Sequence, residues 1–222
     1  MGDTKYKIAV LGGTGNQGYG LALRWGHAGH TVQIGSRDAG RAADAASEID
    51  HPNVSGTDNA AASAAADIIV LTVPFSAQAP TLETVKDSLQ GKILVDVTVP
   101  LVPPKVMRVQ MPSEGSAAQV AQNIVGEGVR VVSAFQNVSA EHLRELDHEI
   151  DCDVLVAGDD KDARQVVIDL AADAGMKAWH VGALVNAAAA ESLTSLLIFM
   201  NKRYKIPGAG IRISGTPGSA ES

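Results

Sequence analysis

The fold of this chain is decided by the stretch Ile8-Ala9-Val10-Leu11-Gly12-Gly13-Thr14-Gly15-Asn16-Gln17-Gly18. An apolar run breaks into glycines, and a helical pattern follows at once. Gly13, Gly15 and Gly18 match G-x-G-x-x-G, whose glycines allow a tight turn, close approach of a pyrophosphate, and close packing of helix on strand. The order strand, turn, helix therefore predicts a dinucleotide-binding unit with the pyrophosphate at the helix N-terminus. A structural turn that binds nothing is the alternative.

The composition indicates an α/β protein of one or two domains. The 222 residues have a net charge of −7, which argues against nucleic acid or an anionic membrane as the main partner. Cys152 is the single cysteine, so an internal disulfide is excluded and a reducing compartment is favoured. No signal-like segment precedes the first strand, and the apolar stretch from Leu193 to Met200 is too short to span a bilayer. We expect a soluble cytoplasmic protein.

The rest of the chain alternates predicted strands and helices. Strands are predicted at 7–11, 31–34, near 54, and at 68–72, 93–97, 130–134, 153–157 and 177–181. Helices are predicted at 16–26, 38–49, after 57, and at 79–89, 116–125, 159–175 and 187–204. This alternation predicts a Rossmann-type, doubly wound, mostly parallel sheet with helices on both faces.

A smaller C-terminal part of helical or α+β structure is expected after the nucleotide-binding domain. We expect the domain to cover residues 1–140, the smaller part residues 141–214, and a disordered tail residues 215–222. In the last helix Leu193, Leu196, Leu197, Met200 and Tyr204 recur at helical spacing, so most of them are expected to be core. Ile198 and Phe199 fall on another side of this helix, which leaves a subunit interface and intramolecular packing as open alternatives.

The end of the second predicted strand favours NADP over NAD. NAD-binding folds place an Asp or Glu about 20 residues after the glycines, on the ribose hydroxyl. Here Ser36, Arg37 and Arg41 stand in that region, and a hydroxyl with two guanidiniums suits a 2′-phosphate. Asp38 is expected to cap the second helix and to point away. Ordinary surface arginines at a helix start are the alternative.

No acid–base set follows the later strands, although ligands bind at these carboxyl ends in doubly wound sheets. Glu114 and Glu191 are the nearest acids, and each is expected to be a cap or a surface residue. The absence of a nucleophile or carboxylate pair predicts no catalytic side chain. It favours a reaction in which one coenzyme passes a hydride directly to another, with the protein supplying the geometry.

The histidines and the cysteine do not indicate a metal site. Turn or surface roles are expected for all six histidines, which are His27, His30, His51, His142, His148 and His180. Cys152 lies between Asp151 and Asp153, whose negative charges are expected to raise the pKa of its thiol.

Eight segments together resemble the NADPH-dependent F420 reductases, also called F420:NADP oxidoreductases. They are Leu11 to Gly18, Gly35 to Arg37, Val70 to Pro74, Ser116 to Ala118, Val131 to Ala134, Gly158 to Asp160, Glu191 to Thr194 and Gly208 to Ile213. The similarity follows the order of the chain over nearly its whole length. It implies a homodimeric Rossmann enzyme that transfers a hydride between NADPH and the 8-hydroxy-5-deazaflavin coenzyme F420.

The resemblance also implies a set of binding residues. It places the pyrophosphate on Thr14, Gly15, Asn16 and Gln17, the 2′-phosphate on Ser36, Arg37 and Arg41, and the nicotinamide against Val73, Pro74, Val99, Val138 and Ala140. It places the deazaflavin against Gln136, Val138 and the segment from Ile206 to Ile211, which includes Gly208, Ala209 and Gly210. These small residues would let the flat deazaflavin ring lie close to the protein backbone. Hydride transfer then needs the reacting carbons of the deazaflavin and the nicotinamide to approach to about 3–3.5 Å.

Two positions depart from the pattern of this family. Gln136 stands where a histidine is often found, and Ala188 to Ala190 stand where an arginine is often found. Gln136 is still expected to donate a hydrogen bond to a deazaflavin carbonyl, without charge.

Lys202, Arg203, Lys205 and Arg212 are candidates for a basic patch that attracts anionic F420, with a solvated helix end as the alternative. Two other functions stay open at this point. One is an NADP-dependent reductase of an imine, a ketone, a flavin or ferric ion, and the other is a non-catalytic NADP sensor.

Overall fold

One sheet of eight strands forms the centre of the computed structural model, which describes residues 4–215. The strands are β1 (Lys7–Leu11), β2 (Thr31–Ser36), β3 (Val54–Asp58), β4 (Ile68–Leu71), β5 (Ile93–Asp96), β6 (Arg130–Ser133), β7 (Val154–Gly158) and β8 (Ala178–His180). Their order is β3-β2-β1-β4-β5-β6-β7-β8. β1 to β6 are mutually parallel, whereas β7 runs antiparallel to β6 and parallel to β8. The predicted doubly wound, mostly parallel sheet is confirmed.

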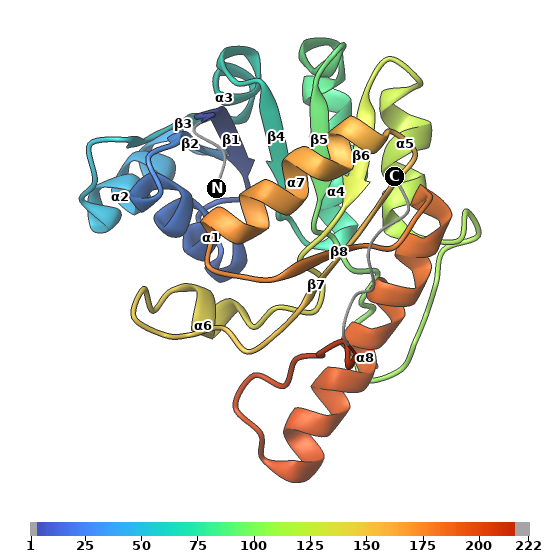
Figure 1. Ribbon diagram of the computed structural model, residues 1–222. Helices are drawn as coiled ribbons and strands as arrows, with labels where there is room; N and C mark the ends of the chain where they lie inside the picture. The colour runs from blue at the N-terminus through green and yellow to red at the C-terminus, as the bar shows by residue number, and fades with distance from the viewer. Residues whose placement is uncertain (1–3, 216–222) are drawn as a thin grey trace.

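Helices cover both faces of this sheet. They are α1 (Asn16–His27), α2 (Ala39–Ile49), α3 (Asn59–Ala65), α4 (Phe75–Val85), α5 (Ala117–Val125), α6 (Ala140–Leu143), α7 (Lys161–Asp173) and α8 (Ala187–Tyr204), with short 3₁₀ turns η1 (Lys86–Leu89) and η2 (Leu184–Asn186). In Figure 1, α1 and α7 lie in front of the sheet and α4 lies behind it. The second half of α8 projects past the carboxyl ends of the strands.

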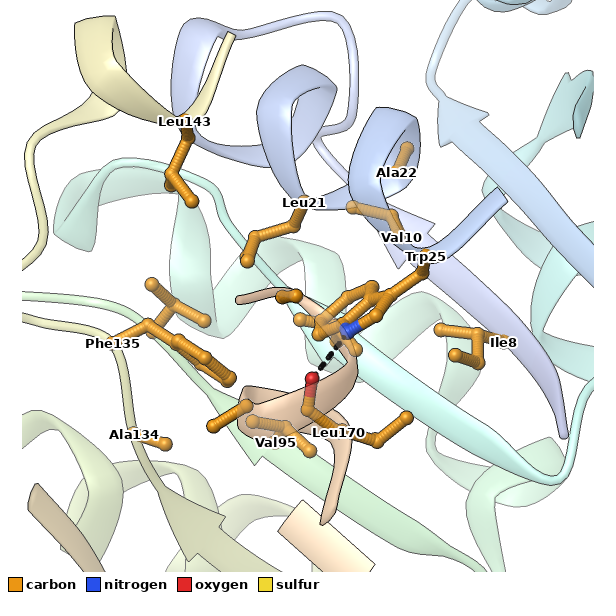
Figure 2. Packing of buried hydrophobic residues seen from close by; sticks show 14 of the residues in the cluster. Ile8, Val10, Leu21, Ala22, Trp25, Val95, Ala134, Phe135, Leu143 and Leu170 are labelled. Carbon is orange, nitrogen blue, oxygen red and sulfur yellow. Dashed lines mark hydrogen bonds between the residues drawn. The ribbon is translucent and has the colours of Figure 1, made fainter. Parts of the chain in front are cut away.

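Two apolar cores follow from the alternation of side chains along each strand. Ile8 and Val10 of β1 join the core formed with α1, α2 and α7, whereas Ala9 and Leu11 join the core formed with α3, α4 and α5. Trp25 is the largest side chain of the first core. Its indole nitrogen donates to the carbonyl of Leu170 at 2.8 Å (Figure 2), so the buried indole is also satisfied in hydrogen bonding.

Helix α4 begins earlier than the sequence predicts. The sequence predicts a start near residue 79. The helix instead begins at Phe75, and Pro80 lies inside it. Pro80 and Ser76 are both exposed, so water can solvate the carbonyl that loses its helical donor.

Most of the apolar side chains of α8 are not core, which contradicts the expectation. Leu197 is buried, but Leu196, Phe199, Met200 and Tyr204 are 49%, 50%, 39% and 65% exposed. The physical reason is the projection of α8 beyond the sheet, where no described element covers this side. By length and composition alone, Leu184–Tyr204 is also apolar enough to cross a membrane, a test that core helices of soluble proteins pass as well.

His30 is also placed wrongly by the sequence, which predicts turn or surface roles. It is fully buried, its Nδ1 accepts from the backbone N–H of Tyr6 at 3.2 Å, and its Nε2 lies 3.0 Å from Asp173. Burial lowers its pKa, and Asp173 opposes that effect. Both ring nitrogens have hydrogen-bond partners, so burying the imidazole leaves no polar atom of the ring unsatisfied.

The C-terminal half joins the same sheet through β7 and β8. Val132 and Ser133 pair with Gly158 and Ala157. Asp160 accepts from the N–H of Ala163 at 2.7 Å and so caps α7, as predicted. The expected tail lies outside the described residues apart from Gly215.

Candidate functional site

The glycine turn joins β1 to α1 and lies against β2. The N–H of Gly12 donates to Gly35 at 3.0 Å, and the N–H of Gly15 donates to Gly12 at 2.9 Å. A Cβ on Gly18 would overlap Thr72 and lie 2.7 Å from the Cα of Gly13, whereas one on Gly15 would meet only Gly12 oxygen, at 3.4 Å. Gly18 is thus required by packing inside the protein, and Gly15 leaves an open surface.

The first turn of α1 presents uncapped N–H groups at this surface. Gly15 is the N-cap residue, and no side chain within residues 4–215 forms a cap hydrogen bond to this helix end. These N–H groups and the helix dipole attract an anion. The turn therefore has the donors and the space that a phosphate group needs.

A first cavity of about 450 Å³ extends from the turn to the end of β2. It is lined by Gly12, Thr14, Gly15, Ser36, Arg37, Asp38, Arg41, Asn59, Thr72, Val73, Pro74, Ala77 and Thr81. The three residues expected at a 2′-phosphate are thus brought together with the glycine turn. Arg37 and Arg41 are exposed and form no ion pair with any described residue, so both guanidiniums are available to an anion.

Asp38 takes the part expected of it. Its Oδ1 accepts from the N–H groups of Gly40 at 2.9 Å and Arg41 at 3.3 Å, which caps α2. Its own N–H donates to the hydroxyl of Ser36 at 3.2 Å. The carboxylate is therefore occupied by the helix rather than standing alone at the end of β2.

A second, mostly apolar cavity of about 700 Å³ continues from the first. It is lined by Gly15, Asn16, Gln17, Thr72, Val73, Pro74, Phe75, Ser76, Val97, Thr98, Val99, Leu101, Val102, Pro103, Val106, Phe135, Gln136, Val138, Ala140 and Thr194. All five residues expected beside a nicotinamide line it. Gly15, Thr72, Val73 and Pro74 belong to both cavities, so one long ligand can occupy the two together.

The loop after β6 forms the floor of the second cavity. Phe135 is buried and has φ of +71°, a left-handed conformation that is uncommon for a bulky residue and is often found at functional sites. Gln17 of α1 donates from its side-chain amide to the carbonyl of Phe135 at 3.2 Å. This hydrogen bond connects the first turn of α1 to the loop after β6. The two walls of the second cavity that these segments form are therefore held in fixed positions relative to each other.

Gln136 differs from its expected role as a hydrogen-bond donor to a ligand. Its Nε2 donates to the carbonyl of Asp96 at 2.8 Å and to the hydroxyl of Ser133 at 2.9 Å. Its Oε1 is buried and has no partner among the described residues. The N–H groups of Gln136 therefore have partners inside the protein, and the amide oxygen is the atom without one. The residue as a whole is only 6% exposed.

The C-terminal segment divides between two further cavities. Gly208 and Ala209 line a third cavity of about 330 Å³ together with Gln136, Val138 and Ala140. Ile206 and Gly210 do not line it; they face a fourth cavity of about 370 Å³, which Gly208 and Ala209 also border. Only part of the expected deazaflavin segment is thus brought to Gln136.

Two buried carboxyl groups lie near the site; the sequence analysis misses Asp96 and names Glu191 only as a cap or a surface residue. Asp96 is fully buried at the end of β5, and burial raises its pKa to about 6. Glu191 on α8 is 1% exposed, and burial raises its pKa to about 8, with a contribution from the negative charge of Asp96. The surface role expected for Glu191 is wrong, although it does cap a helix. The position of Asp96 at the end of the apolar run that starts at Ile93 is the sequence feature that could have indicated a buried carboxyl group there.

Asp96 is held by neighbours that also reach α5. It accepts from the Nε2 of Gln78 at 2.8 Å and from the N–H of Thr98 at 3.1 Å. Gln78 donates as well to the carbonyl of Ala117 at 2.9 Å. These donors lower the pKa of Asp96 without cancelling the effect of burial.

Other titratable groups do not gather into a metal centre. Within residues 4–215, no group of three or more His, Cys, Asp or Glu side chains could hold a metal ion. The pKa of Cys152 is raised, first by burial and then by Asp153 and Asp151, so the expected direction is confirmed with a different main cause. Arg212 is paired with Asp151 at 3.3 Å, which reduces its contribution to a basic patch.

Comparison with known proteins agrees with this arrangement. Residues 7–100 match the family described as NADP oxidoreductase, coenzyme F420-dependent. The chain is 46% identical to the F420-dependent NADP reductase of Methanothermobacter thermautotrophicus, over 95% of this chain and 96% of that protein. It is 40% identical to the enzyme of the same name from Methanocaldococcus jannaschii, over 94% and 98% of the two chains.

A crystal structure from Arthrobacter sp. FB24 has a similar fold. That protein, provisionally described as an F420-dependent NADP-reductase, aligns with a TM-score of 0.79 and 26% identity, over 95% of this chain and 100% of its own. Family match, full-length identity and fold agree with one another. The chain therefore belongs to the F420-dependent NADP oxidoreductase family.

Proposed function

We infer that this protein transfers a hydride between NADPH and coenzyme F420. The observation that carries this inference is the pair of joined cavities, which share Gly15, Thr72, Val73 and Pro74. One cavity ends at two unpaired arginines and the other has apolar walls. A phosphorylated dinucleotide needs a cationic end, and its nicotinamide needs an apolar chamber. The family relatives are named for these two coenzymes.

The phosphates of NADP are assigned to the first cavity. The pyrophosphate is placed at Thr14 to Gln17, where the helix end is uncapped and Gly15 leaves room for it. The 2′-phosphate is placed at Ser36, Arg37 and Arg41, whose hydroxyl and guanidiniums match a phosphate. Asp38 does not oppose this assignment, because the helix occupies its carboxylate.

The nicotinamide is assigned to the second cavity, against Val73, Pro74, Val99, Val138 and Ala140. These side chains orient a ring and exclude water, and they supply no proton. Hydride transfer between two carriers needs close approach of the reacting carbons and little acid–base assistance, so such walls suffice.

The deazaflavin is assigned to the space between Gln136, Val138 and the segment from Ile206 to Gly210, within which Gly208 and Ala209 border the third cavity. The free Oε1 of Gln136 makes it an acceptor from an N–H or O–H of the ligand. We assign residues 1–140 to NADP binding and residues 141–214 to completion of the deazaflavin site. Exposed Lys202 and Arg203 are the cations that would attract the anionic tail.

We further propose a cytoplasmic homodimer that acts on small coenzymes rather than on nucleic acid or a membrane. The exposed apolar side of α8 supports self-association, because Phe199, Met200 and Leu196 form an unpartnered patch on one helix. The net charge of −7 disfavours polyanions. The single buried cysteine is typical of a reducing compartment.

The direct test is spectroscopic. The protein is mixed with NADPH and oxidised F420, and the deazaflavin absorbance is followed between about pH 6 and 8. Loss of that absorbance, dependent on both protein and NADPH, is the expected result. Stable absorbance together with reduction of an imine or FMN would instead support a different acceptor. Binding of NADPH without turnover of any acceptor would support a sensor.

A further inference from the structure

We propose that Arg144 is a positioning residue, which orients the side-chain amide of Asn16 so that its N–H groups face the pyrophosphate of the nicotinamide coenzyme. This inference rests on the proposed placement of that pyrophosphate at the first turn of α1. Arg144 lies far along the chain from the glycine turn, directly after α6. Its Nη1 donates to the Oδ1 of Asn16 at 2.7 Å.

The contact matters because an asparagine amide has two faces of opposite character. Oδ1 only accepts hydrogen bonds and Nδ2 only donates them, so a rotated amide would present an acceptor to an anion. A guanidinium is a donor only and therefore selects Oδ1. With Oδ1 held by Arg144, Nδ2 is directed elsewhere, and within residues 4–215 it meets no hydrogen-bond acceptor. Asn16 also lines the second and third cavities.

Asn16 offers the only side-chain amide N–H groups of this turn that stay free for a ligand among the described residues. The neighbouring amide of Gln17 is bonded to the carbonyl of Phe135. Asn16 is the first residue of α1, next to the uncapped N–H groups. A correctly turned amide there would add two donors to the backbone donors that a phosphate meets.

Arg144 is itself held in a fixed place. Its guanidinium carbon lies 4.4 Å from the centre of the Tyr19 ring, one helical turn after Asn16, which is a cation–π distance. The α1 and α6 backbones approach closely at Gly20, where a Cβ would overlap Leu143.

Arg24 of α1 holds the segment of residues 142–148, which carries Arg144, in place. This buried guanidinium donates to five backbone carbonyls, which belong to Leu143, His142, Glu145, His148 and Ala174. Burial lowers its pKa, and all five of its acceptors are neutral backbone carbonyls. Because four of the five acceptors lie between residues 142 and 148, the loop around Arg144 is anchored to α1 as a unit.

The test uses direct binding of NADPH and NADH to the full chain, without F420. Arg144→Ala is expected to weaken both coenzymes by the same factor, about 3- to 10-fold, because the pyrophosphate is common to both. Arg41→Ala is expected to weaken NADPH alone, since NADH lacks the 2′-phosphate. Arg130→Ala is the matched control, because Arg130 is an exposed arginine that also donates to a neighbouring oxygen but lies outside the site.

A double variant separates positioning from simple charge attraction. In an Asn16→Ala background, Arg144→Ala should cause no further loss, because there is no amide left to orient. A full effect of Arg144→Ala in the Asn16→Ala background would overturn the inference, because the guanidinium would then act on the coenzyme directly.

The inference and the proposed function fail in different ways. If the unchanged protein does not bind NADPH, the proposed function is wrong. If it binds NADPH with the expected loss in Arg41→Ala, but Arg144→Ala binds both coenzymes as the unchanged protein does, only the role of Arg144 is wrong. Equal thermal unfolding of the variants shows that the exposed substitution has left the fold intact.

Discussion

A carboxylate oxygen of Glu191 lies 2.7 Å from the backbone nitrogen of Ala117, so a side chain of α8 caps the start of α5. The other oxygen accepts from the N–H of Ala118 at 3.1 Å. One turn later, the hydroxyl of Thr194 donates to the carbonyl of Gln136 at 2.9 Å. One stretch of α8 therefore joins α5 to the loop that forms the floor of the second cavity.

The first prediction concerns the pH dependence of stability. The pKa of Glu191 rises from 4.5 to about 8 on folding, and that of Asp96 rises from 3.8 to about 6. Between about pH 4 and 8 these two carboxyl groups thus bind more protons in the folded protein than in the unfolded chain. The free energy of unfolding should therefore fall as pH rises through this window, by up to about 1.4 kcal/mol per pH unit for each group.

Glu191→Gln should flatten this dependence between about pH 6 and 8, where Asp96 no longer contributes. At pH 5 the variant should be less stable by about 1 kcal/mol, because an amide cannot accept both N–H groups. Urea unfolding at a series of pH values measures both effects. Glu127→Gln is the matched control, since Glu127 is an exposed acid and should leave the slope unchanged. An equal slope in Glu191→Gln and the unchanged protein would contradict the role of this carboxyl.

The sequence predicts the sheet and the arginine end of the site well, because local patterns determine them. The apolar run before Gly12 is followed at once by a glycine turn and a helical pattern, an order that predicts a covered strand. Arg37 comes directly after the second predicted strand, so its place at the carboxyl end of the sheet follows. Asp38 was correctly read as a cap, since a cap depends on residues two or three positions away. Each of these inferences uses short-range chemistry.

Contacts between distant segments could not be predicted in the same way. Glu191 lies more than 70 residues from the helix that it caps, and the partners of Gln136 lie on two different strands. Leu196 has the helical spacing of a core residue but is 49% exposed, because this part of α8 projects beyond the sheet. Spacing tells which side chains share a face, whereas the position of the whole helix decides whether that face is covered.

The second prediction separates the roles of two glycines. Gly18→Ala should destabilise the fold by about 1–3 kcal/mol, because the added Cβ would overlap Thr72 and crowd the backbone of Gly13. Gly15→Ala should leave the midpoint of thermal unfolding almost unchanged, since its Cβ meets only one atom, at 3.4 Å. It should nevertheless weaken NADPH binding, because that Cβ enters the space assigned to the pyrophosphate. Thermal unfolding and NADPH titration of both variants test the pair, and equal NADPH affinity in Gly15→Ala would count against the placement.

The third prediction concerns the exposed side of α8. Phe199 is 50% exposed, so Phe199→Asp should not disturb the core of one chain. If α8 forms the dimer interface, a buried unpaired charge there should convert the dimer to a monomer. Sedimentation equilibrium measures the mass directly. Leu146→Asp is the matched control, because Leu146 is 41% exposed and belongs to the loop after α6 rather than to α8. A monomeric unchanged protein, or a dimeric Phe199→Asp variant, would show that this side of α8 has another role.

The fourth prediction tests the choice between the two nicotinamide coenzymes. Arg37 is exposed at the end of the first cavity and has no anionic partner among the described residues. Arg37→Glu should weaken NADPH by at least about 1.5–3 kcal/mol, the contribution of a hydrogen bond to a charged group, which corresponds to about 10- to 100-fold. NADH should bind as before or more tightly, because a carboxylate can accept from the ribose 2′-hydroxyl. Titration of each coenzyme into the variant measures the ratio.

Lys161→Glu controls for the same change in net charge, since Lys161 is exposed on α7. Long-range repulsion would weaken NADPH in both variants, and that loss would shrink as salt screens it. A direct contact predicts a loss confined to Arg37→Glu and to NADPH. If Arg37→Glu instead weakened NADH as strongly as NADPH, the guanidinium would be acting on a group that both coenzymes carry, and the 2′-phosphate would have to lie elsewhere.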